Sequence, residues 1–173
     1  MIARVKLLID DEVADLWAGT FHHIANRILR MNAWRLGYER HFSIIDTEDA
    51  RQMMNGCIAE AGVDAKKDKF PKGEILRDIL SLSANTESSV EDIVFKRYPF
   101  FYERLDDIQR VLTLYLLNKK KLHIMDFDDL LLNCKALFVE FPDVAGQYAR
   151  RFHHVLVDEY QDTNRIQADL VDL

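Results

Sequence analysis

Apolar residues recur every three or four positions along most of this chain, and that spacing lines one face of an α-helix. Glycine and proline, which break helices and shape turns, make up only 9 of the 173 residues (6 Gly and 3 Pro). A turn-rich all-β sandwich needs many more of both. The chain is therefore predicted to be mainly α. Its length predicts one domain or a compact pair of domains, and enough buried surface for one core.

Residues suited to N-caps stand before several of these apolar stripes, and their side-chain oxygens can accept hydrogen bonds from the free amides of a first turn. They predict helices that begin after Thr20, Asp46, Ser89, Asp126 and near Asn164. Pro71 and Pro142 predict two further helix starts, and Gly62 predicts a helix end. Residues 1–9 are typical of the tail of a helix, and 42–45 of a short strand or an extended connection.

One segment departs from the helical period. Val155, Leu156 and Val157 form a β-branched apolar run with no helical alternation, which predicts a buried strand ending at Asp158 and Glu159. A single buried strand needs neighbours for its backbone hydrogen bonds. The chain is therefore expected to be an excised piece of a larger α/β protein, cut at both ends and dominated by a helical segment.

Charge and cysteine content exclude several classes of protein. The formal net charge is −6, from 23 basic and 29 acidic residues, so a basic footprint over the whole chain is missing. No apolar window approaches a membrane span and no signal peptide opens the chain, which predicts no membrane partner. Cys57 and Cys134 lack metal-ligand spacing and are expected to be buried thiols in a reducing cytoplasm.

An acidic pair follows the predicted strand. In phosphate-cleaving motors, one carboxylate at such a position holds magnesium through oxygen, and a second orients the attacking water and accepts its proton. Asp158 and Glu159 have the residue types and the adjacency for these two roles. Considered alone, the pair also fits a common acidic turn after a strand.

A second motif combines a glycine with two polar side chains at a helix start. Gly19 permits a close backbone approach, and the free amides of the following turn attract phosphate. The Thr20 hydroxyl and the His22 imidazole are donors suited to a phosphate oxygen, with Arg27 and Arg30 one to two turns further on. The plain alternative is an N-cap beside a surface histidine.

A third motif, Met-Asp-Phe-Asp-Asp-Leu-Leu at residues 125–131, places three acidic residues at a helix start. They favour the helix dipole, and considered alone they need do nothing more. In this order the three motifs resemble the UvrD/Rep/PcrA family of superfamily 1 DNA helicases. The last block, Val-Asp-Glu-Tyr-Gln-Asp-Thr-Asn at residues 157–164, is the most specific because it matches the Walker B region of that family.

The resemblance implies a division of the chain. Residues 1–23 and 151–173 would be remnants of a RecA-like α/β motor core, the second with the Walker B strand, and residues 24–150 would be a helical insertion subdomain. The fold class expected is thus mainly α with a small α/β remnant. The partners implied are single-stranded DNA, a duplex junction and the remainder of the helicase chain.

The resemblance also implies residue roles. Asp158 would hold Mg²⁺ and Glu159 would be the catalytic base, while Gln161 and Asp162 would couple the nucleotide site to neighbouring motifs. DNA contacts would come from Thr20, His22, Arg27 and Arg30. The parent would be an ATP-dependent helicase of 3′-to-5′ polarity that uses ATP and Mg²⁺.

No Gly-x-x-x-x-Gly-Lys-Thr/Ser phosphate loop occurs in the sequence. This chain alone is therefore predicted to hydrolyse no ATP, to hold neither cofactor and to bind DNA weakly. Two alternatives stay open at this point: a non-catalytic helical protein-interaction module, and a fragment of a helicase–nuclease of the RecB or AddA kind.

Overall fold

A computed structural model of the chain describes residues 16–63 and 69–173, and within them the protein is mainly helical. The expected helical tail at residues 1–9 lies outside this part. The helices are α2 (Phe21–Asn32), α3 (Thr47–Glu60), α4 (Gly73–Thr86), α5 (Val90–Arg97), α6 (Leu105–Lys121), α7 (Phe127–Glu140), α8 (Pro142–Arg151) and α9 (Arg165–Asp172). Short 3₁₀ turns are η2 (Ala33–Leu36), η3 (Pro99–Arg104) and η4 (Tyr160–Asp162).

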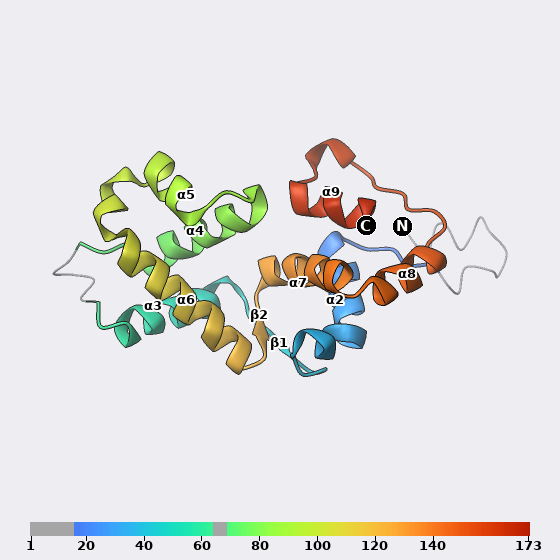
Figure 1. Cartoon of the computed structure of the whole chain (residues 1–173), viewed down its shortest axis with the longest axis horizontal. Coiled ribbons are helices and arrows are strands. Elements are labelled where there is room, and N and C mark those ends of the chain that lie inside the picture. Colours follow the sequence, from blue (N-terminus) through green and yellow to red (C-terminus); the bar gives the residue numbers. More distant parts are fainter. Residues whose placement is uncertain (1–15, 64–68) are drawn as a thin grey trace.

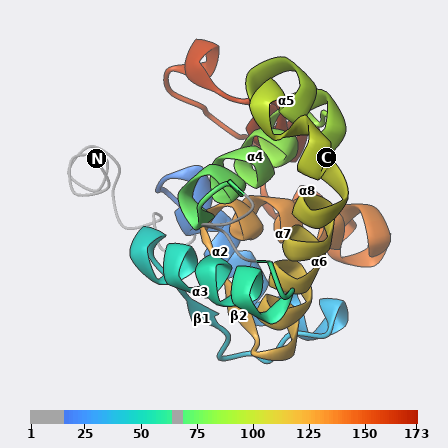
Figure 2. The ribbon, with the colours of Figure 1, turned by 90° about the vertical axis from the view of Figure 1, so that its left-hand side faces the viewer.

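The helices pack around two separate hydrophobic cores, each of which defines a lobe (Figure 1). The first lobe contains α2, η2, α7, α8 and α9, with Leu29 and Leu137 at its centre. The second lobe contains α3 to α6, with Leu76 and Tyr115 at its centre. Figure 2 shows the second lobe from its outer end, with α3, α4, α5 and α6 in front.

Two short strands lie between the lobes. β1 (Ser43–Ile44) leads from the first lobe into the second, and β2 (Ile124–Met125) leads back. They pair in parallel, with Ser43 opposite Ile124 and Ile44 opposite Met125. Within the described residues the chain therefore passes between the lobes through this pair of strands. Of the two alternatives for residues 42–45, a short strand or an extended connection, the short strand is confirmed.

The buried strand predicted at residues 155–157 is wrong. The segment is extended but pairs with no strand in the described part of the chain, and Leu156 is 97% exposed. The segment finds no sheet there to join, and the side chains of Val155 and Leu156 lie in solvent. The RecA-like α/β remnant is accordingly not confirmed, and the boundaries at residues 23 and 151 stay a prediction.

Most of the predicted helix starts are confirmed. Thr20, Asp46, Ser89, Asp126 and Asn164 are all N-caps whose side chains accept from first-turn amides. Pro142 begins α8, whereas the helix expected at Pro71 begins two residues later, at Gly73. Gly62 adopts the left-handed backbone that ends a helix, with φ of 72°.

Both cysteines are free and buried, as predicted, and burial raises the pKa of the Cys134 thiol to about 12. Among the helices of residues 16–63 and 69–173, none is both long and apolar enough to cross a membrane.

Candidate nucleic-acid interface and acidic turn

The start of α2 presents polar groups to solvent. Thr20 is exposed, and its Oγ1 accepts a hydrogen bond of 3.3 Å from the backbone amide of His23. The remaining first-turn amides of an α-helix have no partner within the helix, and they carry the positive end of its dipole. This end of α2 is therefore suited to an anionic ligand, although the N-cap alone accounts for Thr20.

An aromatic side chain from a distant motif joins this helix start. The ring of Phe127, the first residue of α7, lies 5.9 Å from the ring of His22 in an edge-to-face arrangement. Phe127 is 53% exposed although it is large and apolar. Sequence reasoning treated the motif at residues 125–131 as acidic and missed its phenylalanine. The only available signal was an apolar residue between two charged ones at a helix start.

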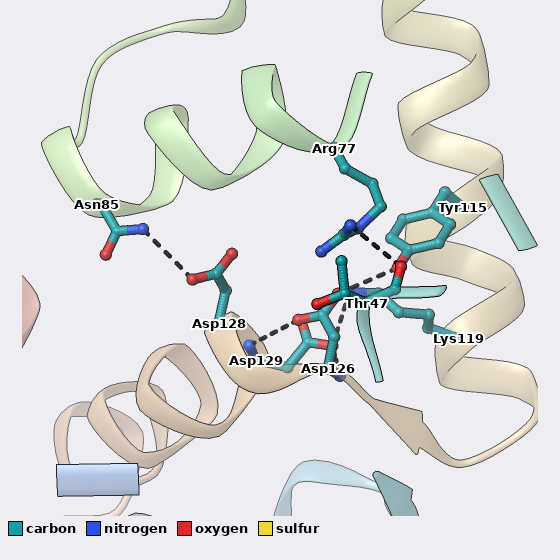
Figure 3. A network of polar contacts seen from close by, with 8 residues as sticks. All are labelled: Thr47, Arg77, Asn85, Tyr115, Lys119, Asp126, Asp128 and Asp129. Carbon is teal, nitrogen blue, oxygen red and sulfur yellow. Dashed lines mark hydrogen bonds and ion pairs between the residues drawn. The ribbon is translucent and has the colours of Figure 1, made fainter. Parts of the chain in front are cut away.

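The acidic residues around Phe127 fold inward instead. Asp126 and Asp129 form a reciprocal capping box, in which each carboxylate accepts from the other residue's amide at 3.0 and 2.9 Å. Lys119, near the end of α6, donates from Nζ to Asp126 Oδ2 at 2.7 Å and to Asp129 Oδ2 at 2.6 Å. Lys119 is only 2% exposed, so this ion pair is buried (Figure 3).

Burial and charge act differently on the two carboxyl groups. Burial raises the pKa of Asp129 to about 6; the negative charge of Asp126 adds to this rise, and Lys119 opposes it. Burial is the largest effect on the pKa of Asp126 and would raise it, but the charge and hydrogen bond of Lys119 oppose it. The Asp129 amide and the Tyr115 hydroxyl help to hold the pKa of Asp126 below its usual value. The site therefore has one carboxyl group with a lowered pKa and one with a raised pKa.

This buried cluster also joins the two lobes. The Tyr115 hydroxyl, from the core of the second lobe, donates to Asp126 Oδ2 at 3.1 Å, and Asp126 caps α7 of the first lobe. A cavity of about 180 Å³ lies beside it between α4, α6 and α7. Arg77 of α4, which also lines the cavity, donates to the carbonyl of Thr47 at 3.2 Å (Figure 3).

The two arginines predicted to contact DNA point elsewhere. The Arg27 guanidinium is exposed and stacks over the Trp17 ring at 3.8 Å. Arg30 lies over the ring of Phe42 at 3.8 Å and donates to the Phe42 carbonyl at 2.6 Å, an arrangement that fixes the chain after η2. The structure thus brings His22, two residues after Thr20, together with Phe127, and it directs Arg27 and Arg30 to other neighbours.

The acidic turn after residue 157 is exposed. Asp158 accepts from the amide of Glu159 at 3.1 Å, and Gln161 donates to the Glu159 carboxylate. Glu159 has a left-handed backbone, with φ of 53°, which is uncommon for a residue other than glycine. The turn continues through η4, where Asp162 is exposed, into the N-cap of α9 at Asn164.

These side chains suit a hydrated magnesium ion. Mg²⁺ is commonly bound by one or two carboxylates, with water and substrate phosphates completing its shell. Asp158 and Glu159 supply two exposed carboxylates on adjacent residues. No group of three or more potential metal ligands occurs in the described ranges, so the remaining ligands would be water and phosphate oxygens.

Donors at a helix start with an exposed ring beside them are groups that can contact nucleic acid. Comparison with known families identifies the class of protein. The family model for the UvrD/REP helicase N-terminal domain matches residues 1–173, and the chain belongs to that family.

Among its relatives are proteins named ATP-dependent DNA helicase PcrA. The chain is 36% identical over 171 residues to the one from Bacillus subtilis, and the matched stretch covers 99% of this chain and 22% of that relative. It is 34% identical over 180 residues to the one from Staphylococcus aureus, and that match covers 100% of this chain and 23% of the relative. The chain thus spans less than a quarter of the length of these relatives.

Proposed function

We propose that this chain is part of the first motor domain of an ATP-dependent DNA helicase of 3′-to-5′ polarity, in which it contacts single-stranded DNA. The polarity rests on the family resemblance. The observation that carries the proposal is the contact of His22, in the first turn of α2 after Thr20, with the exposed ring of Phe127, although α2 and α7 are more than 90 residues apart in sequence. Family membership supports DNA as the ligand.

The contact surface combines the two interactions that single strands need. Hydroxyl, imidazole and backbone N–H donors can bind phosphate oxygens, and an exposed aromatic ring can stack on a base of any identity. Only a few phosphate contacts are expected there, so the affinity of this chain alone is expected to be weak, with a Kd roughly in the micromolar-to-millimolar range, and to fall with added salt.

Replacement of Phe127 tests this surface. Phe127→Ala is expected to weaken binding of a fluorescent oligo-dT strand by roughly 5- to 100-fold, because stacking of one base contributes about 1–3 kcal/mol. His22→Ala is expected to weaken it less, through loss of one donor. Fluorescence anisotropy at low and moderate salt measures both, together with the salt slope.

Phe100→Ala is the matched control, since Phe100 is 73% exposed but lies on η3 in the second lobe. It is expected to leave the affinity unchanged. Equal losses in the two phenylalanine variants would argue against a defined surface. If the wild-type chain binds no DNA and instead self-associates tightly, the alternative of a protein-interaction module is supported.

The acidic turn is proposed to act in ATP hydrolysis only within a longer chain. Asp158 would hold Mg²⁺, and Glu159 would orient the attacking water and accept its proton. Gln161, which donates to the Glu159 carboxylate, would keep that side chain oriented. Asp162 would connect the turn to α9. A bound Mg²⁺·ATP would supply the phosphate and the cation charge.

This chain alone is expected to release no phosphate from ATP above a protein-free blank, because its sequence contains no phosphate loop. A phosphate-release assay with Mg²⁺, with and without single-stranded DNA, measures this. Glu159→Gln is the matched control for a contaminating ATPase. Turnover by the wild-type chain that DNA stimulates and Glu159→Gln abolishes would contradict the prediction.

A further inference from the structure

The last turn of α4 reaches from the second lobe to both α7 and α9 through a row of amide groups. Asn85 donates from Nδ2 to Asp128 Oδ1 at 3.3 Å and accepts at Oδ1 from Asn164 Nδ2 at 2.7 Å. The first of these bonds is drawn in Figure 3. Asp128 directly follows Phe127, and Asn164 lies two residues beyond Asp162.

The chemistry of this row requires amides at its two asparagines. A carboxylate only accepts, so the NH₂ group of Asn85 must face Asp128 and its oxygen must face Asn164. Asn164 in turn uses Oδ1 to cap α9, by accepting from the amide of Gln167 at 2.9 Å, and keeps its NH₂ for Asn85. Serine would cap α9 equally well, but its shorter side chain carries no NH₂ group to reach Asn85, and an ionised aspartate carries no donor at all.

Ion pairs run beside this row and join the same three helices. Glu87, just past the end of α4, pairs with Lys135 of α7 at 2.6 Å and with Arg165 of α9 at 3.0 Å. Lys135 also pairs with Asp169 of α9 at 2.6 Å. Glu87 has a left-handed backbone, with φ of 53°, so the chain turns there in a conformation uncommon outside glycine.

We propose that Asn85 is a positioning residue that couples the acidic turn to the DNA-contact surface through the row Asn164–Asn85–Asp128. The coupling rests on the function proposed above, because it joins the proposed nucleotide segment to Phe127. Displacement of the acidic turn moves the N-cap of α9, and the row transmits that movement to the first turn of α7. By linkage, DNA bound at Phe127 restrains α9 in return.

The reciprocal effect is measurable in this chain without ATP. Saturation with an oligo-dT strand of about 16 nucleotides is expected to slow hydrogen exchange at the amides of Gln167 and Ala168 by about fivefold or more in the wild-type chain. Both amides are bonded to Asn164, at Oδ1 and at its carbonyl oxygen, so they report on this N-cap. Exchange is followed residue by residue by NMR.

Two variants remove the row in different ways. Asn85→Ala deletes its centre, and Asn164→Ser keeps the cap of α9 but removes the NH₂ donor. Both are expected to abolish the DNA-induced slowing. Their affinity for oligo-dT is expected to stay within about twofold of the wild type, far less than the tenfold change that corresponds to 1.4 kcal/mol. Asp128→Asn, which still offers an oxygen to Asn85, is expected to retain the slowing.

Thr86→Ala is the matched control, because the Thr86 hydroxyl donates to Leu82 O within α4 itself. It is expected to behave as the wild type. If oligo-dT binds but α9 is not slowed, or stays slowed in Asn85→Ala and Asn164→Ser, the coupling is wrong while the proposed DNA surface stands. If the wild-type chain binds no oligo-dT, the proposed function fails, and the coupling falls with it.

Discussion

Lys119→Met is expected to lower the free energy of unfolding by about 3–5 kcal/mol, because it leaves Asp126 and Asp129 buried without their cation. Methionine keeps the unbranched stem of the lysine, so lost packing contributes little. Urea denaturation at neutral pH measures the loss. A change below about 1 kcal/mol would show that the buried charges are compensated in some other way.

The control for Lys119 lies two residues further along the same helix. Lys121→Ala removes an exposed lysine from the last turn of α6 and is expected to change stability by about 0.5 kcal/mol or less. The double variant Lys119→Met with Asp129→Asn is expected to be more stable than Lys119→Met alone, because it removes one of the two uncompensated charges. The opposite order would contradict the electrostatic account.

Asp129→Asn is expected to gain stability relative to the wild type as the pH rises from about 4 to about 7. The folded state raises the pKa of Asp129 from an ordinary 3.8 to about 6, so between these values the folded protein holds a proton that the unfolded chain releases. Wild-type stability therefore falls with rising pH through this group. The shift of roughly two units corresponds to an effect on the order of 3 kcal/mol.

Asparagine cannot ionise, so the variant lacks this loss. Urea midpoints of the two proteins at constant ionic strength, from pH 4.5 to 7.5, measure the difference. Asp106→Asn, which removes an exposed acid at the start of α6, tests whether loss of any aspartate has the same effect. A wild-type–variant difference that is constant with pH would show that Asp129 titrates normally.

Only part of the proposed functional surfaces could be predicted from the sequence. The motifs around Thr20, Asp126 and Asp158 were visible, and family resemblance grouped them. The contact of His22 with Phe127, and the Asn85 row, were not visible, since both depend on residues more than 40 positions apart. Spacing within a motif carries no information on such pairs.

What the sequence determined by itself is local. Helical periodicity and the caps at Thr20, Asp46, Ser89, Asp126 and Asn164 set the helix starts, because a cap and its first turn are bonded over three residues. The helix predicted at Pro71 begins two residues later, at Gly73, and no side-chain cap precedes it.

Only the tertiary structure decided which side chains became buried partners. Val155 and Leu156 have the composition of a buried strand, yet they lie in solvent, because strand formation requires hydrogen bonds from a neighbouring strand. Lys119 sits in a run of three lysines that looks solvated, yet it is buried, because the first turn of α7 presents two carboxylates to it. For the strand residues and for Lys119 alike, pairing with a distant segment decides whether the side chain is buried, and residue type does not.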